Sequence, residues 1–197
     1  MKYTIHPGSN HHVIIHLHGT GGTSAGLFGL GQMLDEDAIL VGIDGAVLEH
    51  GMRRYFARYP DGSFDLESLH DNTVVLNDVI NQIIKEHHFQ DYKISMLGYS
   101  NGANIAQNLI KEFELNIDNL ILYHPSPTRM DTPFKKHNHL RVFMTGGDHD
   151  PFISKDDFKQ MQKMLKDADI KVKTFVHSGG HELIQEEIIK TKEFLNK

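Results

Sequence analysis

A serine stands between two glycines midway along the chain, in the run Gly98-Tyr99-Ser100-Asn101-Gly102. An apolar run ending at Leu97 precedes it and a helical pattern over 101–113 follows it, so a strand turns into a helix at Ser100. This spacing is typical of a nucleophile elbow. Its strained turn lifts the hydroxyl clear of the sheet, and the helix presents N-terminal amides to developing negative charge. The alternative is an ordinary strand–helix turn made of small residues, which these five residues alone do not exclude.

A nucleophilic Ser100 needs a base, because a serine hydroxyl is hardly ionised at neutral pH, and the base needs a carboxylate to orient it. His181 is the candidate base, since it follows the last predicted strand and two glycines let its loop cross the sheet. Two aspartates compete for the acid role, Asp148 and Asp150, in the loop after the strand over 140–144. We favour Asp150, because Asp-Pro followed by an apolar pair suits a loop returning towards a helix. Either carboxylate could instead simply tighten a turn.

The negative oxygen formed by attack on a carbonyl needs hydrogen-bond donors. The backbone amide of Asn101, the residue after the candidate nucleophile, is the first candidate. The second is the amide of Thr20, in a glycine-rich loop over 17–23 whose backbone can come close to a bound carbonyl. This loop lacks the lysine of a P-loop and the spacing of a dinucleotide-binding turn, so it does not predict phosphate binding.

Two histidines raise the question of a metal. His16 and His18 are two apart on a predicted strand and therefore point the same way. No cluster supplies a third ligand, and His181-Glu182 is not followed by the second histidine of an H-E-x-x-H motif, so we predict no metal and no cofactor. Several other histidines are expected to be solvated, in polar loops or at helix ends: His11, His12, His87, His88, His137 and His139.

The elements that must position these residues alternate along the chain. Short apolar runs predict strands over 13–17, 39–43, 92–97, 120–123, 140–144 and 170–176. Apolar spacings of three and four predict helices over 69–83, 101–113, 154–168 and 184–195. This is an α/β pattern: a doubly wound, mostly parallel sheet of about six to seven strands with helices on both faces. The run 120–123 is expected inside the sheet and the lysine-containing strand 170–176 near its edge.

The composition is that of an ordinary globular protein. The 197 residues, 39% of them hydrophobic and 23% charged, suit a single domain over 1–197. A formal net charge of −6 argues against a nucleic-acid partner. The chain has no cysteine, which excludes disulfides and thiolate catalysis, and we expect neither a signal peptide nor membrane insertion. A cytoplasmic protein with a small-molecule substrate is therefore expected, and a homodimer is left open.

Together these motifs resemble the α/β-hydrolase superfamily, most closely its small carboxylesterase and lysophospholipase-like branch near the dienelactone-hydrolase-like proteins. The likeness rests on an oxyanion loop, an elbow, an acid loop and a base segment, at 18–22, 98–102, 147–151 and 180–182. The family pattern places its acid directly before the proline, which implies Asp150. It also implies a serine carboxylesterase without a lid domain. Dienelactone hydrolases themselves use a cysteine nucleophile, so their own activity is not implied here.

The loop over 44–65 is the longest candidate cover for the site. Its segments 49–56 and 61–65 resemble bacterial carboxylesterases linked to hydroquinone or aromatic stress. The side chains of Arg53, Arg54, Tyr55 and Phe56 either line the substrate pocket or pack the loop down. An open site favours short, soluble esters. The same triad would serve a thioesterase or a lysophospholipase, and a non-catalytic small-molecule receptor on this fold is an alternative of a different class.

Overall fold

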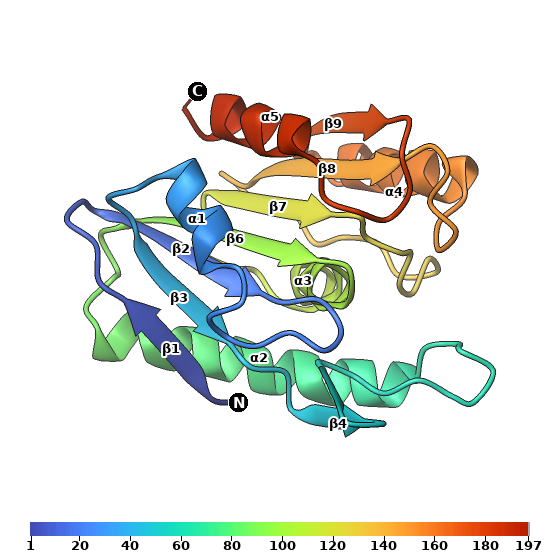
Figure 1. The fold of residues 1–197 in the computed structure, drawn as a ribbon, viewed down its shortest axis with the longest axis horizontal. Coiled ribbons are helices and arrows are strands. Elements are labelled where there is room, and N and C mark those ends of the chain that lie inside the picture. The colour runs from blue at the N-terminus through green and yellow to red at the C-terminus, as the bar shows by residue number, and fades with distance from the viewer. Residues whose placement is uncertain (197) are drawn as a thin grey trace.

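Seven strands form one sheet in the computed structural model, which describes residues 1–196 (Figure 1). Their order across the sheet is β1-β3-β2-β6-β7-β8-β9. Every neighbouring pair is parallel except β1 with β3, so the sheet is mostly parallel, as predicted. The bounds are Tyr3–His6 for β1, His12–Leu17 for β2, Ile39–Ile43 for β3, Lys93–Tyr99 for β6, Asn119–Tyr123 for β7, Arg141–Gly147 for β8 and Lys171–His177 for β9.

Helices cover both faces of the sheet (Figure 1), which confirms the predicted doubly wound α/β architecture. They are α1 (Phe28–Leu34), α2 (Leu66–Glu86), α3 (Asn101–Glu112), α4 (Lys155–Asp167) and α5 (Gln185–Leu195). One buried cluster joins α2, α3 and α4 to the sheet, and a second joins α1 and α5 to the opposite face. Within residues 1–196, no helix combines the length and apolar character that crossing a membrane would take.

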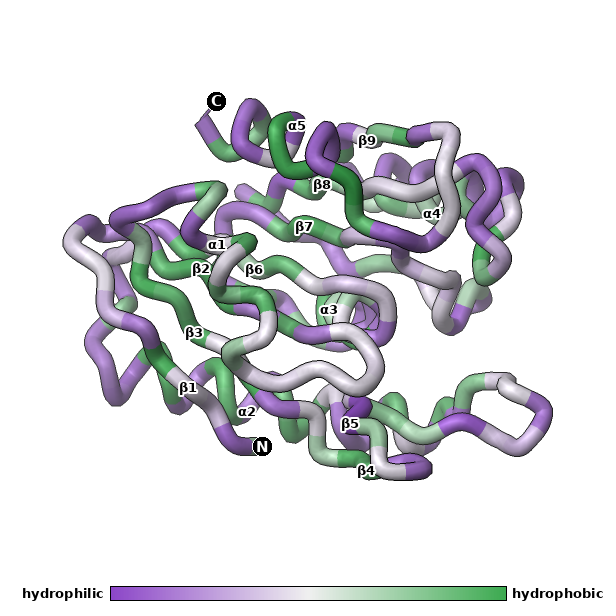
Figure 2. The backbone as a smooth tube through the Cα atoms, in the orientation of Figure 1, coloured by the Kyte–Doolittle hydropathy of each residue, from purple (hydrophilic) through white to green (hydrophobic). Residues whose placement is uncertain are grey.

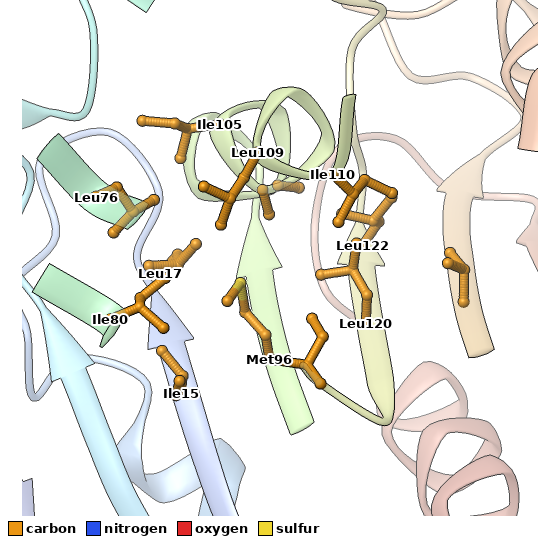
Figure 3. Packing of buried hydrophobic residues seen from close by; sticks show 14 of the residues in the cluster. Ile15, Leu17, Leu76, Ile80, Met96, Ile105, Leu109, Ile110, Leu120 and Leu122 are labelled. Carbon is orange, nitrogen blue, oxygen red and sulfur yellow. The ribbon is translucent and has the colours of Figure 1, made fainter. Parts of the chain in front are cut away.

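The two clusters follow from the alternation of side chains along each strand. Adjacent residues Ile14 and Ile15 of β2 are both fully buried, but they belong to different clusters on opposite faces. In the larger cluster, strand residues such as Ile15 meet Ile80 of α2 and Leu109 of α3 (Figure 3). Hydrophobic residues are accordingly concentrated in the central strands (Figure 2), which hold the loops at their carboxyl ends in fixed positions.

The predicted order of burial across the sheet is confirmed. β7 lies between β6 and β8 with every residue buried, and β9 forms an edge. Outside the 44–65 segment, two elements were not predicted. β1 is a short antiparallel edge strand whose residues are alternately half-buried and exposed. α1 contains Gly29 and Gly31, and glycines weaken the helical signal of a seven-residue segment.

The segment 44–65 was expected to be a plain polar loop, and this prediction is wrong in part. It contains a hairpin of β4 (Val47–Glu49) and β5 (Met52–Arg54). The two turn residues, His50 and Gly51, both have positive φ, at 49° and 77°, as a tight hairpin with the right twist requires. The hairpin adds no lid domain, and it brings the arginine-rich end of β5 towards the carboxyl edge of the main sheet.

The prediction that six histidines are solvated holds for four of them and is wrong for the other two. His12 is 7% exposed, with its ring nitrogens 2.8 Å from Asp35 Oδ2 and 2.9 Å from Ser95 Oγ. His137 is 6% exposed and its Nε2 lies 3.0 Å from the carbonyl oxygen of Ile110. Both rings find buried hydrogen-bond partners that are distant in sequence, which local polarity does not reveal. The exposed four are His11, His87, His88 and His139.

Candidate active site

Ser100 occupies a strained turn between β6 and α3. Its φ and ψ are 52° and −114°, a combination that residues other than glycine seldom adopt. A Cβ atom on Gly98 would lie 2.5 Å from the carbonyl oxygen of Gly102, and one on Gly102 would lie 2.1 Å from that of Leu17. Side chains are therefore excluded at both positions. The G-x-S-x-G spacing reflects a real lack of space around the turn.

Ser100, His181 and Asp150 lie in one chain of contacts. His181 Nε2 is 2.8 Å from Ser100 Oγ, and His181 Nδ1 is 2.7 Å from Asp150 Oδ2. Ser100 follows β6, Asp150 follows β8 and His181 follows β9, so the carboxyl ends of three strands supply the three residues. The competing Asp148 pairs instead with exposed Lys155 at 3.1 Å, at the surface.

The electrostatics of this chain keep Asp150 a carboxylate beside His181. Burial alone raises the pKa of Asp150, but the amide of Phe152 and contacts with His181 and His124 lower it below its ordinary value overall. An ionised Asp150 accepts the Nδ1–H of His181, which leaves the Nε2 lone pair facing the Ser100 hydroxyl. The Phe152 ring packs edge-on against His181 at 4.8 Å, and Tyr99 donates a hydrogen bond to the carbonyl oxygen of His181.

The two predicted oxyanion donors face the same cavity as Ser100. Thr20 and Asn101 both line it, and within residues 1–196 neither backbone amide donates a hydrogen bond to another protein group. Thr20 is held by the hairpin, because Arg54 Nη1 donates to Thr20 Oγ1 at 3.0 Å and the next amide, of Gly21, donates to the Arg53 carbonyl at 2.8 Å. The hairpin therefore braces the loop that carries a candidate donor.

The cavity has a volume of about 580 Å³ and is lined by Ser100 and His181 along with residues of the 44–65 segment. This size suits a small ligand. The sequence left open whether four side chains of this segment line the pocket or pack the loop down. Of the two arginines, Arg54 lines the cavity and Arg53 does not. Tyr55 and Phe56 are fully buried and pack the segment down.

A buried group of polar side chains lies directly behind Asp150. His124, the residue after β7, has its Nδ1 3.1 Å from Asp150 Oδ2 and its Nε2 3.0 Å from Glu187 Oε1, with no exposed side-chain surface on any of the three. Burial alone lowers the pKa of His124, but Glu187 and then Asp150 raise it above its ordinary value overall. With a carboxylate oxygen close to each ring nitrogen, His124 is placed to carry both ring protons, as a cation between two buried carboxylates.

Glu187 is held from several sides. Burial alone raises its pKa, but contacts with His124 and Thr145 and the amide of Ile184 lower it overall, so it remains ionised. Thr145 Oγ1 donates to Glu187 Oε1, and the Ile184 amide donates to Oε2 at 2.8 Å. The buried acid therefore has the hydrogen bonds that a charge needs in the interior.

Comparison with known proteins identifies the family. Residues 55–189 match the model of the dienelactone hydrolase family. A protein of Bacillus subtilis (strain 168), "Putative hydrolase MhqD", is 34% identical over 194 residues, which cover 98% of this chain and 97% of that protein. This chain belongs to the dienelactone hydrolase family. The predicted resemblance is thereby confirmed.

Solved structures agree with the family assignment. The Bacillus cereus carboxylesterase superimposes on this hydrolase with a TM-score of 0.94 and 33% identity, over 100% of this chain and 93% of that one. A protein of unknown function from Agrobacterium tumefaciens str. C58 gives a TM-score of 0.89 and 32% identity, over 98% of this chain and 94% of that one. The protein is therefore a hydrolase of the dienelactone hydrolase and carboxylesterase group, with the α/β-hydrolase fold.

The sequence reading of this hydrolase missed His124, Glu187 and Arg58. A usable signal existed for His124, because it comes directly after a predicted central strand, at the same sheet edge as Ser100. Glu187 lies among the apolar positions of the predicted last helix, where a buried acid needs a partner. No local pattern distinguishes Arg58 from its neighbours, and only the folded structure shows that it lines the cavity.

His16 and His18 do not form a shared metal site in this hydrolase. His18 Nδ1 lies 2.7 Å from the Gly19 carbonyl oxygen, and His18 Nε2 accepts the amide of Gly45 at 3.1 Å, so no lone pair is left for a metal. Burial lowers the pKa of His16 to about 4, and its ring packs against Phe28. His18 instead holds the backbone of the glycine-rich loop.

Two groups of three side chains bring possible ligand atoms within 4.8 Å of one another: His124 with Asp150 and His181, and His124 with His177 and Glu187. In both groups, imidazole nitrogens face carboxylate oxygens at ion-pair distance. The amide of Gly179 donates to His177 Nδ1 at 2.9 Å, so the proton of that ring is on Nε2, towards Glu187. Protons shared between imidazole and carboxylate account for these contacts without a metal.

Proposed function

We propose that this hydrolase is a serine carboxylesterase acting on small to medium carboxylic esters. The observation that carries the proposal is the continuous contact from Ser100 Oγ through His181 to Asp150, at 2.8 and 2.7 Å. Asp150 is buried and ionised, and His181 directs a lone pair at the serine hydroxyl. This is the arrangement that makes a serine nucleophilic at neutral pH.

The reaction follows from these positions. Ser100 Oγ attacks the ester carbonyl carbon while His181 Nε2 takes the hydroxyl proton and Asp150 stabilises the resulting imidazolium. The carbonyl electrons move to oxygen, where the amides of Thr20 and Asn101 donate hydrogen bonds to the oxyanion. Collapse expels the alcohol, which takes the proton from His181, and leaves an acyl-serine. Water, deprotonated by His181, then attacks the acyl-serine, releasing the acid and restoring the Ser100 hydroxyl.

The choice of esters rests on the cavity and on one relative. A cavity of about 580 Å³ with no lid domain above it suits soluble esters of modest length better than long-chain triglycerides. The structural neighbour from Bacillus cereus bears the name carboxylesterase. The triad acts on the reacting carbonyl and not on the leaving group, so a thioester or a lysophospholipid could react in the same way.

The test is turnover of p-nitrophenyl acetate and butyrate by the purified protein, with labelling of Ser100 by a fluorophosphonate probe. We expect both, and we expect Ser100→Ala to abolish both while leaving the fold intact. Protein that neither hydrolyses these esters nor takes the label would refute the proposal and support a non-catalytic binding role. Comparing kcat/KM for a matched oxygen ester and thioester then separates an esterase from a thioesterase.

A further inference from the structure

One wall of the cavity comes from residues 125–129, a segment after β7 that has no regular secondary structure and that we call the loop wall. Ser126 and Pro127 line the cavity together with Ser100. His124, directly before the loop wall, and Arg129, at its end, have positive φ angles of 50° and 43°. Residues other than glycine seldom adopt this conformation, so contacts with the rest of the fold must maintain it.

Three polar side chains of α3, which we call the clamp residues, hold the loop wall. Asn104, Gln107 and Lys111 follow one another at spacings of three and four, which places them along one side of the helix. The Ser126 amide donates to Asn104 Oδ1 at 2.7 Å, and Gln107 Nε2 donates to the Ser126 carbonyl oxygen at 3.2 Å. The Thr128 amide donates to Gln107 Oε1 at 3.2 Å. The helix therefore binds the backbone of the loop wall much as a neighbouring strand would.

Lys111 completes this row with a buried charge. The residue is 3% exposed, and its Nζ donates to the carbonyl oxygens of Thr128 and Arg129 at 2.5 and 2.8 Å. The same Nζ lies 4.8 Å from the centre of the Phe134 ring. Burial lowers the pKa of Lys111 to about 8, so the amine is mostly protonated at neutral pH. An ammonium group is costly to bury, and the hydrogen bonds that this one makes fix the end of the loop wall.

The sequence of the loop wall matches this arrangement. Prolines occupy positions 125 and 127, and the amides of the alternate residues, Ser126 and Thr128, are the ones that the clamp residues bind. Proline has no N–H, so the two prolines leave no donor that needs a partner. Pro127 also has a restricted φ and presents a stiff apolar ring to the cavity. This boundary of the cavity cannot yield easily to a longer ligand.

We propose that Gln107 and Lys111 are positioning residues that fix the loop wall, and that Pro127, held in this way, limits the length of the ester that Ser100 cleaves. The inference rests on the proposed esterase function and adds a determinant of substrate size to it. Ser100 is the N-cap of α3, so one helix carries both the nucleophile and the clamp residues and sets the distance between the nucleophile and the wall. Gln107 and Lys111 do not line the cavity, so they act on the substrate only through the loop wall.

The kinetic test measures kcat/KM over two series of esters. p-Nitrophenyl esters from acetate to decanoate lengthen the acyl part, and butyrate esters from ethyl to decyl lengthen the alcohol part. In at least one series we expect kcat/KM of the native protein to fall sharply beyond a limiting length, and that series identifies the part of the ester that meets Pro127. A native profile without such a fall in either series would overturn the proposal.

Pro127→Ala removes the ring and frees φ, so it should raise kcat/KM of the first rejected ester about tenfold. The kcat for the best ester should change by less than about twofold, because the triad is untouched. Pro133→Ala is the matched control: it makes the same change at an exposed proline further along the same connection, which does not line the cavity. A limiting length that Pro127→Ala leaves in place, or that both variants move equally, would refute the role of Pro127.

Lys111→Met removes the ammonium group while keeping a side chain of similar length. We expect the limiting length to increase, and the amides of Ser126 and Thr128 to exchange hydrogen at least about tenfold faster. Lys85→Met should do neither, although Lys85 is likewise the basic residue in the last turn of its helix, because it is exposed. Gln107→Leu, which removes the other hydrogen bonds to Thr128 and Ser126, should act as Lys111→Met does. If both variants lower kcat for every ester alike and keep the limiting length, their role is only structural and the proposal fails.

A binding measurement keeps this inference separate from the esterase proposal. Equilibrium dialysis of Ser100→Ala protein compares p-nitrophenyl butyrate with octanoate, and ethyl butyrate with octyl butyrate. We expect Pro127→Ala in this background to raise the relative affinity for the longer member of at least one pair about tenfold. That shift without turnover of any ester by the native protein would support the wall and refute the esterase. Turnover with a limiting length that Pro127→Ala and Lys111→Met leave unchanged would support the esterase and refute the wall.

Discussion

His124 and Asp150 meet at the carboxylate oxygen that also binds His181. His124 Nδ1 lies 3.1 Å from Asp150 Oδ2, and His181 Nδ1 lies 2.7 Å from the same atom. On its far side, His124 faces Glu187 at 3.0 Å. Asp150, cationic His124 and Glu187 together carry one net negative charge, as a lone Asp150 would, but a positive charge now lies next to the oxygen that orients His181. This cation holds in place the carboxylate that orients His181.

The first prediction concerns His124→Asn. His124 has a φ of 50°, which asparagine tolerates, and the amide keeps an N–H donor for Asp150. The variant loses the positive charge of the His124 ring, whose centroid lies 5.2 Å from that of the His181 ring. We expect the acid limb of the kcat/KM pH profile to move up by about one pH unit, because protonation of the essential base becomes easier. A profile that keeps its acid limb while kcat falls would assign His124 a purely structural role.

The second prediction concerns the stability contributed by Glu187, measured as the difference in free energy of unfolding between the native chain and Glu187→Gln. The pKa of Glu187 is depressed below 4.5, so its contribution is present above pH 4.5 and is lost as the pH falls through the folded-state value. The pKa of His124 is raised above 6.5, so its contribution is present below pH 6.5 and is lost as the pH rises through the folded-state value. The difference should therefore be largest between pH 4.5 and 6.5.

In that window we expect Glu187→Gln to lower the free energy of unfolding by about 3 kcal/mol, because the variant removes one of the two carboxylates that face the buried His124 cation. Urea unfolding at about pH 5.5 measures the difference inside this window, and unfolding at about pH 3.5 and about pH 9 measures it roughly 1 and 2.5 units outside. Glu186→Gln is the control, since it removes the same charge from an exposed neighbour in α5. A cost that does not change with pH would show that packing, and not the ion pair, is lost.

The third prediction separates the two aspartates of the acid loop. Asp150→Asn should lower kcat by about 10⁴-fold, since the amide no longer holds the required tautomer of His181. Asp148→Asn removes only a surface ion pair with Lys155 and should change kcat by less than about twofold. Both variants keep the size of the side chain, so steady-state kinetics on one ester measures the role of each. The opposite ranking would move the acid to Asp148.

Much of the fold could be predicted because its signals are local. Continuous apolar runs gave the positions of the six predicted strands, and Gly98 and Gly102 marked the turn at Ser100. The preference for Asp150 also came from local sequence, through the proline that follows it. Each of these inferences needed only a few neighbouring residues.

Other features depend on how distant segments meet. The contact between His124 and Glu187 joins residues that are far apart in the chain, and it exists because β7 pairs with β8 and α5 packs against β8. The hairpin turn was hidden because His50, and not the asparagine or aspartate typical of such turns, precedes Gly51. The position of Arg58 in the lining of the cavity likewise depends on where the 44–65 segment lies. Such features require the register and packing of the whole fold.

The fourth prediction tests why glycine flanks Ser100. A methyl group added at Gly102 would lie 2.1 Å from the carbonyl oxygen of Leu17, at the point where α3 packs against β2. The neighbour is backbone and cannot rotate away, so Gly102→Ala should force α3 off the sheet and destabilise the protein by at least about 2 kcal/mol. Ser100 is the N-cap residue of α3, so we expect esterase activity to fall together with the free energy of unfolding.

Gly29→Ala is the matched control, because it makes the same change in a helix where a Cβ atom would meet nothing within 4 Å. There alanine should stabilise α1 by roughly 0.5–1 kcal/mol through its higher helix propensity. Chemical denaturation of both variants measures the two free energies. If Gly102→Ala is as stable and as active as Gly29→Ala, close packing is not what requires glycine beside the serine, and the strained turn at φ 52° must be maintained by contacts other than those between α3 and β2.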